Sequence, residues 1–282
     1  DSPSAAAAEV APDPFAGAIV DLVPVQRAAV TVEPIGSIAE WFRKLTIADV
    51  GVLYEDPYLQ IGIKMMYQGC RGRAVLYFGN KNVFTLEKLT VNIAPTPGLT
   101  VTPTNTLPAA LASKQQVQYV LDVSCQMPFL RPPALQLAYA MSLEEPVQVK
   151  QQLDLPVVCN KFLLPKQVSE PNEFFNTWRS LAPSMKLQEV LTVKPELVAA
   201  GLPGIVQLFG SLKLNVVPGL DPNPNNLVTL ATIATETPQE VLCIVRLESD
   251  ANNNAQFRLT VASNFQIASA SVKQLVVQHL KS

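Results

Sequence analysis

A heptapeptide at residues 117–123 reads VQYVLDV, and every second residue in it is apolar. Because successive side chains of a β-strand point to opposite faces of a sheet, this alternation predicts a strand with one face in a core and one in water. Similar runs, separated by turn residues, are Leu59–Tyr67, Arg73–Phe78, Phe84–Ile93, Gln116–Cys125, Ala134–Met141 and Val147–Leu153. About seven short strands in roughly 100 residues are typical of an immunoglobulin-like β-sandwich.

The pattern changes after residue 160. Residues 169–181 predict a capped helix with Pro171 in its first turn, and residues 265–280 predict a second helix with an apolar face. Short strand-like pieces lie between the two helices: Leu187–Val193, Gly204–Leu208, Ser211–Val217, Val228–Thr235, Glu240–Leu247 and Gln256–Ala262. This mixture predicts a small α+β unit, a mixed α/β platform, following the all-β unit.

Residues 1–50 are rich in proline and alanine, which indicates a hinge or linker that is largely extended or disordered. One segment differs, because Ser37 and Glu40 have the spacing of a capping box ahead of residues 41–45. That pattern predicts a short helix, either packed on the neighbouring unit or exposed as a ligand segment. The sequence therefore divides into 1–50, a sandwich at 51–160 and a platform at 161–282.

Composition limits the function. The chain is 48% hydrophobic and 16% charged with a net charge of −2, and it has no run of Lys or Arg, so nucleic acid is an unsuitable partner. Its apolar stretches are far shorter than the ~20 residues of a membrane span, and its beginning lacks the pattern of a secretory signal. The four cysteines are far apart, which favours buried free thiols over a zinc site, with a disulfide as the alternative.

Motifs for catalysis are scarce. The single histidine, His279, lies near the end of the chain, where we expect a surface helix residue without triad partners. The chain contains neither Gly-x-x-x-x-Gly-Lys-Ser/Thr nor Gly-x-Gly-x-x-Gly after a predicted strand, the two glycine-rich patterns that bind phosphate groups. We therefore expect no enzyme, no cofactor and no metal, although a hydrolase whose site these motifs fail to reveal stays an alternative.

Aromatic and charged residues gather in the predicted platform. Phe174, Phe175 and Trp178 share one short helix at spacings that place at least one ring away from a single-sided core, unless all three are buried. Arg246 and Glu248 alternate with apolar residues and so share the opposite face of a strand. Such a pair is either a simple surface ion pair or part of a recognition site.

At these residues the chain resembles the appendage ("ear") of clathrin-adaptor large subunits of the alpha-adaptin class. The resemblance covers about 220 residues, from Tyr58 to the end. The matching segments are Gln60-Ile61-Gly62-Ile63-Lys64, Gly79-Asn80-Lys81, Asn160-Lys161-Phe162, Phe174-Phe175-x-x-Trp178, Asp221-Pro222-Asn223-Pro224-Asn225 and Arg246-Leu247-Glu248. It implies a β-sandwich followed by a platform, and a non-catalytic module that binds short linear motifs of disordered endocytic accessory proteins.

The resemblance also implies two sites. A platform site for Asp-Pro-Phe/Trp and Phe-x-Asp-x-Phe motifs would be formed by Phe175, Trp178, Arg246, Glu248 and Arg258. A sandwich site for Trp-x-x-Phe motifs would be formed by Lys64, Tyr77 and Gln116, with Tyr77 standing where the family has Phe. The implied setting is the cytoplasmic face of the plasma membrane at clathrin-coated pits, with other adaptor subunits bound through the rest of the full-length protein.

Two alternatives remain at this level. A beta-adaptin or coatomer gamma appendage would share the two-part architecture but prefer different motifs. In addition, Asp13-Pro14-Phe15 in the predicted linker matches the expected platform ligand and is either an uninvolved tripeptide or a weak intramolecular competitor.

Overall fold

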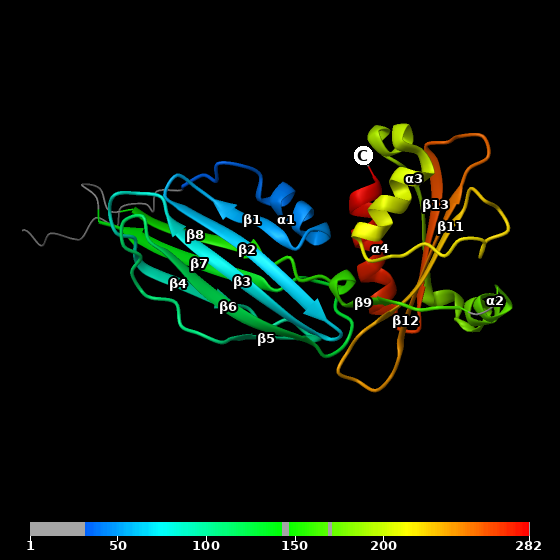
Figure 1. Cartoon of the computed structure of the whole chain (residues 1–282), viewed down its shortest axis with the longest axis horizontal. Coiled ribbons are helices and arrows are strands. Elements are labelled where there is room, and N and C mark those ends of the chain that lie inside the picture. Colours follow the sequence, from blue (N-terminus) through cyan, green and yellow to red (C-terminus); the bar gives the residue numbers. More distant parts are fainter. Residues whose placement is uncertain (1–31, 143–146, 169–170, 282) are drawn as a thin grey trace, which may run out of the picture.

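The computed structural model describes residues 32–142, 147–168 and 171–281. Within these ranges the chain forms two units that lie side by side along the long axis of the molecule (Figure 1). The first unit contains only sheets and one short helix, and the second combines a sheet with three α-helices. The predicted fold class, a β-sandwich followed by a mixed α/β platform, is confirmed.

The sandwich consists of two antiparallel sheets. The first has the order β1 (Val50–Glu55), β2 (Leu59–Gln68), β3 (Arg71–Asn80), β6 (Gln116–Cys125) and β5 (Leu99–Pro103). The second has the order β4 (Glu87–Ile93), β7 (Ala134–Met141) and β8 (Val147–Asp154). Alternate residues such as Ile61, Leu76 and Leu121 are fully buried between the sheets, as the alternating sequence predicts.

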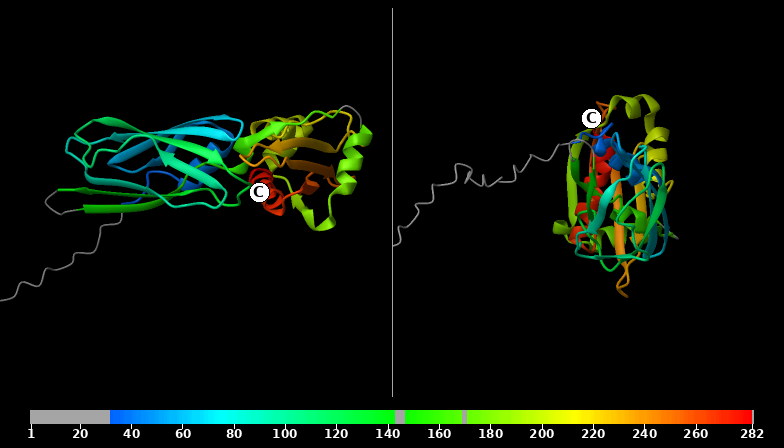
Figure 2. Two further views of the ribbon diagram at one scale, coloured as in Figure 1. Left: turned by 90° about the horizontal axis from the view of Figure 1, so that it is seen from below. Right: turned by 90° about the vertical axis from the view of Figure 1, so that its left-hand side faces the viewer.

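The platform is built on a second five-stranded antiparallel sheet. Its order is β10 (Lys186–Thr192), β13 (Gln256–Ser263), β12 (Val241–Ser249), β11 (Leu227–Ile233) and β9 (Leu163–Pro165). The helix α2 (Pro171–Ser180) lies on the side of this sheet that faces away from the sandwich, whereas α3 (Pro195–Ser211) and α4 (Gln266–Leu280) lie on the sandwich side (Figures 1 and 2).

Two hydrophobic clusters therefore cover the two faces of the platform sheet. On β12, Cys243, Val245 and Leu247 join the larger cluster, which includes residues of α4 and of the sandwich. The intervening Leu242 and Ile244 join a smaller cluster around Phe174 of α2. The two-residue period of the strand sorts its side chains between these clusters.

The N-terminal part of the described chain differs from the expected extended linker. Residues 38–47 form the helix α1, and the Ser37 hydroxyl accepts a hydrogen bond of 3.2 Å from the Glu40 amide, as the capping pattern predicts. Burial of Leu45 and Thr46 fixes this helix to the sandwich, so residues 32–50 belong to the folded unit. Residues 1–31, including Asp13-Pro14-Phe15, lie outside the described residues.

The expected strands Gly204–Leu208 and Ser211–Val217 are wrong. The first is part of α3, in which Gly201 adopts a φ of 63° and Pro203 restarts the helix in a position suited to a first turn. The second is largely a loop with one bridge between Val216 and Thr229. The strands β1, β5 and β9 are additional to those predicted. In this region the glycines and the proline interrupt the spacing of apolar residues that would otherwise indicate a helix.

The two units share one continuous core and several polar contacts. The ammonium of Lys161, which is 4% exposed, donates to the Ala48 carbonyl at 3.0 Å and to the Asp49 carboxylate at 2.8 Å. Burial lowers the pKa of Lys161, and the Asp49 carboxylate opposes that shift. The amide of Glu236 donates to the Cys125 carbonyl at 2.9 Å. These contacts connect the sandwich to the platform at two separate points.

The four cysteines are free thiols, in agreement with the preferred prediction, although Cys70 is only half-buried. Burial raises the pKa of Cys159 to about 11 and that of Cys243 to about 12, which keeps both thiols protonated. Among the described residues, the helices are all too short or too polar to span a bilayer.

His279 is not a surface residue, contrary to expectation. It is 1% exposed, and its Nε2 lies 2.8 Å from the Thr46 hydroxyl of α1. Its position on α4 turns it towards the sandwich rather than towards water. Burial, together with the charges of Arg43 and Lys194, lowers the pKa of His279 to about 4. The neutral imidazole is therefore part of the junction.

This burial predicts a pH dependence of stability. His279 binds a proton near pH 6.5 in the unfolded chain but only near pH 4 in the folded chain. The contribution of the neutral His279 to the free energy of unfolding is therefore complete above pH 6.5 and is lost as the pH falls towards 4. Between pH 7.5 and pH 5 the free energy of unfolding should fall by about 2 kcal/mol more in the wild type than in His279→Gln, as measured by urea denaturation. Equal pH dependence in both proteins would contradict this assignment.

Candidate peptide-binding sites

Three aromatic rings on α2 have different degrees of burial. Phe174 is 2% exposed and packs in the smaller cluster, whereas Phe175 and Trp178 are only half-buried. The ring centroids of Phe174 and Trp178 are 6.2 Å apart in a stacked arrangement, and those of Phe174 and Phe175 are 5.3 Å apart edge to face. Phe174 thus fixes the helix to the sheet, and the other two rings keep surface in contact with solvent.

The predicted charged residues form one chain of ion pairs on the same face of the sheet. The Arg246 guanidinium contacts the Asp221 carboxylate at 2.8 Å and the Glu248 carboxylate at 2.9 Å. Arg258 donates to both oxygens of Glu248 at 2.8 Å. Because Glu248 and Arg258 are directly opposite each other on β12 and β13, strand register sets this contact.

The residues at the two ends of this series of ion pairs, Asp221 and Arg258, have pKa shifts in opposite directions. Burial would raise the pKa of Asp221, but hydrogen bonds from the Asn223 amide, Arg246 and Asn226 bring it below its usual value. The hydrogen bond to Glu248 raises the pKa of Arg258, whose side chain is 54% exposed. Arg246 is thus held rigidly as a cation, and Arg258 is the more accessible of the two.

The α2 rings lie near the charged residues because alternate residues of β12 share one face of the sheet. Ile244 packs with the α2 rings, and Arg246 is two residues further along the same face of β12, about 7 Å away. Glu248 and Arg258 line a hollow of about 610 Å³ together with Val190, which is 59% exposed. Phe175, Trp178 and Arg246 are on this face but outside the lining of that hollow.

Lys186 was not among the predicted site residues. Its ammonium lies 5.0 Å from the centroid of the Trp178 ring, at the start of β10. This cation–π contact orients the indole ring. No sequence motif indicates it, because it depends on the packing of α2 over the first residue of a strand.

The predicted sandwich residues meet on the outer face of the first sheet. Lys64 of β2, Tyr77 of β3 and Gln116 of β6 line one hollow of about 570 Å³. Gly62 is paired with Tyr77 on one side, and Gly79 follows two residues later on β3, so two of the positions beside Tyr77 carry no side chain, whereas Gln118 of β6 is paired with Tyr77 on the other side. Lys114 also lines this hollow and was missed by the sequence analysis.

Comparison with known proteins identifies the family. The family model "Adaptin C-terminal domain" matches residues 49–156, and "Alpha adaptin AP2, C-terminal domain" matches residues 161–280. The chain belongs to the alpha-adaptin appendage family. Together the two models span the sandwich and the platform of this appendage.

Curated relatives agree with this assignment. The appendage is 39% identical to AP-2 complex subunit alpha-2 of Arabidopsis thaliana over 275 residues, and 38% identical to subunit alpha-1 of the same plant. It is 29% identical to AP-2 complex subunit alpha-2 of Dictyostelium discoideum over 242 residues. These alignments cover 97%, 97% and 85% of this chain but only 26%, 26% and 24% of the relatives. The appendage thus spans about a quarter of their length.

The different burial of the α2 rings predicts different effects on stability. Phe174→Ala should lower the free energy of unfolding by about 3–4 kcal/mol because it leaves a cavity in the smaller cluster. Trp178→Ala and Phe175→Ala should each cost about 1–2 kcal/mol because these rings are partly in water already. Urea denaturation of the three variants measures this order, and an equal loss in all three would show that the rings form a single core.

Proposed function

We propose that this appendage is the non-catalytic protein-interaction module of a clathrin adaptor, and that its platform binds Asp-Pro-Phe/Trp and Phe-x-Asp-x-Phe motifs. The observation that carries the proposal is the placement of the half-buried rings of Phe175 and Trp178 on the same sheet face as two guanidinium groups. Family membership supports the same class of function.

The chemistry of these motifs fits that surface. An aromatic anchor removes its surface from water best against other rings, which Trp178 and Phe175 provide. A neighbouring aspartate needs a cation, and Arg258 presents the more exposed guanidinium. Arg246 is held between Asp221 and Glu248, so it can receive a hydrogen-bond acceptor with little loss of side-chain entropy.

Glu248 adds selectivity to this arrangement. Its carboxylate accepts from both arginines and leaves the local charge close to balanced. A ligand with many acidic residues would meet repulsion here, whereas one carboxylate beside an aromatic ring can replace part of the existing ion pairing. The surface therefore suits compact acidic-aromatic motifs.

A motif of five or six residues buries little surface, so single sites should bind in the micromolar range or more weakly. Several copies in one disordered endocytic accessory protein would increase the effective affinity. As part of this proposal, the full-length protein acts at the cytoplasmic face of the plasma membrane in clathrin-coated pits, bound to other adaptor subunits outside this appendage.

The sandwich hollow is proposed as a second site, for Trp-x-x-Phe motifs. Tyr77 offers a ring beside two glycine positions, and Lys64 and Gln116 offer a cation and an amide at its sides. We also propose that the predicted ranges 51–160 and 161–282 are two subdomains, each with its own ligand class, and that residues 32–50 extend the first of them.

Peptide titration tests both sites. An Asp-Pro-Phe peptide, followed by fluorescence anisotropy, should bind Trp178→Ala and Arg246→Ala at least about tenfold more weakly than wild type. Tyr77→Ala should leave that affinity unchanged, but it should weaken binding of a Trp-x-x-Phe peptide.

The two titrations control each other, because each variant is tested with both peptides. Equal affinity of the Asp-Pro-Phe peptide for wild type, Trp178→Ala and Arg246→Ala would contradict the platform assignment. Loss of both affinities in one variant would indicate misfolding, and the stability measurements on the α2 rings identify that case.

A further inference from the structure

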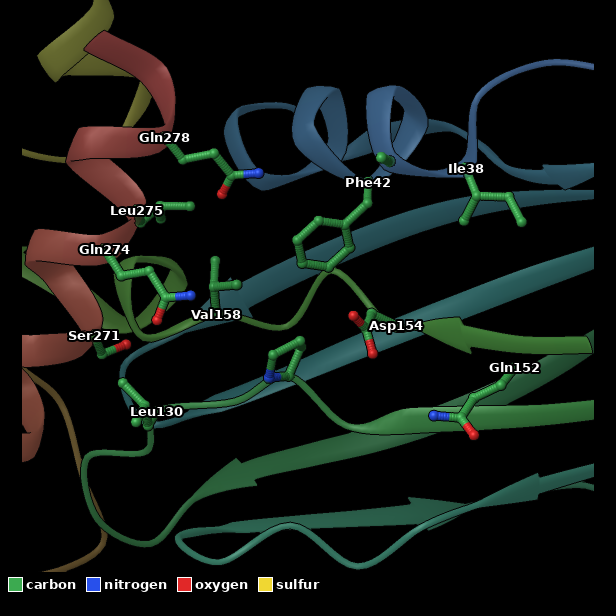
Figure 3. A pocket seen from close by; sticks show the side chains of 12 residues that line it. Ile38, Phe42, Leu130, Gln152, Asp154, Val158, Ser271, Gln274, Leu275 and Gln278 are labelled. Carbon is green, nitrogen blue, oxygen red and sulfur yellow. The ribbon is translucent and has the colours of Figure 1, made fainter. Parts of the chain in front are cut away.

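A third hollow lies between the two units, away from both proposed peptide sites. It has a volume of about 660 Å³, which is within the usual range for ligand sites. It is bounded by α1 on one side, α4 on the second and the end of β8 on the third (Figure 3). The side chains that line it are Ile38, Ala39, Phe42, Leu130, Pro132, Gln152, Asp154, Val158, Ser271, Gln274, Leu275 and Gln278.

The residue spacing of two elements, α4 and β8, directs several of these side chains into one space. On α4, Ser271, Gln274, Leu275 and Gln278 follow the i, i+3, i+4, i+7 spacing of one helix face. Gln152 and Asp154 are alternate residues of β8, so they share a face of that strand. The hollow is thus a product of regular secondary structure rather than of an irregular loop.

Most of the lining is apolar. The ring of Phe42 extends from α1 into the hollow, and Leu275 and Val158 form its inner wall (Figure 3). Leu130 is 47% exposed at its edge, a large fraction for a leucine that borders a core. An apolar side chain of a ligand would remove these surfaces from water.

Asp154 is the one ionisable residue among the twelve that line the hollow. Its carboxylate lies below the ring of Phe42 in the view of Figure 3. Within the described residues it has no hydrogen bond and no ion pair, and only the charge of Arg131 acts on it. Burial raises the pKa of Asp154, and Arg131 opposes that shift. The hollow thus holds one exposed carboxylate beside apolar walls, with Arg131 as a nearby opposite charge but no ion-pair partner among the described residues.

Three exposed glutamines line the same hollow as this carboxylate. The side-chain amides of Gln152, Gln274 and Gln278 have no hydrogen-bond partner within the described part of the chain, and each offers both a donor and an acceptor. Amides of this kind pair well with the backbone N–H and C=O groups of an extended peptide. A small organic cation would leave most of these groups unused.

We propose that this hollow is a binding site for a peptide segment of a partner protein in which an apolar side chain is adjacent to a lysine or arginine. The apolar side chain would contact Phe42 and Leu275, the cation would pair with Asp154, and the glutamine amides would bind the peptide backbone. This specificity is opposite in charge to that of the acidic-aromatic motifs, and it does not depend on the platform assignment.

Occupancy of this site would act on both units at once. The walls come from α1 of the sandwich and α4 of the platform, the two helices that also meet through Thr46 and His279. A ligand that binds only the assembled junction stabilises it in proportion to its occupancy. The same site would therefore link partner binding to the rigidity between the two units.

The test uses two short probes on the whole chain, N-acetyl-Leu-Arg-Phe-amide and N-acetyl-Leu-Gln-Phe-amide, followed by amide chemical shifts. The arginine probe should bind at least about threefold more tightly and shift resonances of α1, β8 and α4. Asp154→Asn should remove this preference, and Gln274→Lys, which adds a cation to the lining of the hollow, should weaken binding of the arginine probe.

Glu196→Gln is the matched control, because it removes one exposed carboxylate of α3 outside the hollow and should keep the preference for arginine. Trp178→Ala should also keep it, which separates this site from the platform. Equal binding of both probes to wild type, or shifts confined to other surfaces, would overturn the proposal. Tighter probe binding after deletion of residues 1–31 would also overturn it, because the occupant would then be this chain itself.

Discussion

The platform sheet has two buried faces, and this constraint determines where a ligand can bind. Odd-numbered residues of β12, such as Val245, are committed to the core shared with α4. The even-numbered residues begin in the smaller core, with Ile244 under α2, and continue beyond the helix as Arg246 and Glu248. Because α2 covers only part of this face, β12 passes from buried apolar side chains to half-buried charged side chains over neighbouring residues of the same face. The boundary between them is the candidate platform site.

The junction determines how the two units present their surfaces together. One hydrophobic cluster runs from the sandwich into the platform, and Lys161 and His279 are buried where α1 and α4 approach each other. A buried cation that had lost its partner would be strongly destabilising, which makes the relative position of the units specific. The platform surface, the sandwich hollow and the hollow at the junction are consequently held in a fixed arrangement.

Sequence patterns predicted the strands well where one face is buried and the other is in water, as in β6 and β7. They failed for α3, where Gly201 and Pro203 interrupt the helical period although the structure restarts the helix there. They failed for His279 because position near a chain end says nothing about tertiary contacts. Arg246, Glu248 and Arg258, which the family resemblance groups in one site, are joined by ion pairs in the structure, whereas the Lys186 contact and the junction hollow depend on packing between distant elements.

The half-buried rings of Phe175 and Trp178 and the adjacent guanidinium groups are proposed to form one recognition surface. A crystal structure of the appendage with an Asp-Pro-Phe peptide tests it most directly. In that structure the peptide phenyl ring should lie against Trp178 and Phe175, and the peptide carboxylate should be within hydrogen-bond distance of Arg246 or Arg258. A peptide bound elsewhere, with Trp178 uncovered and the ion pairs of Glu248 unchanged, would contradict it.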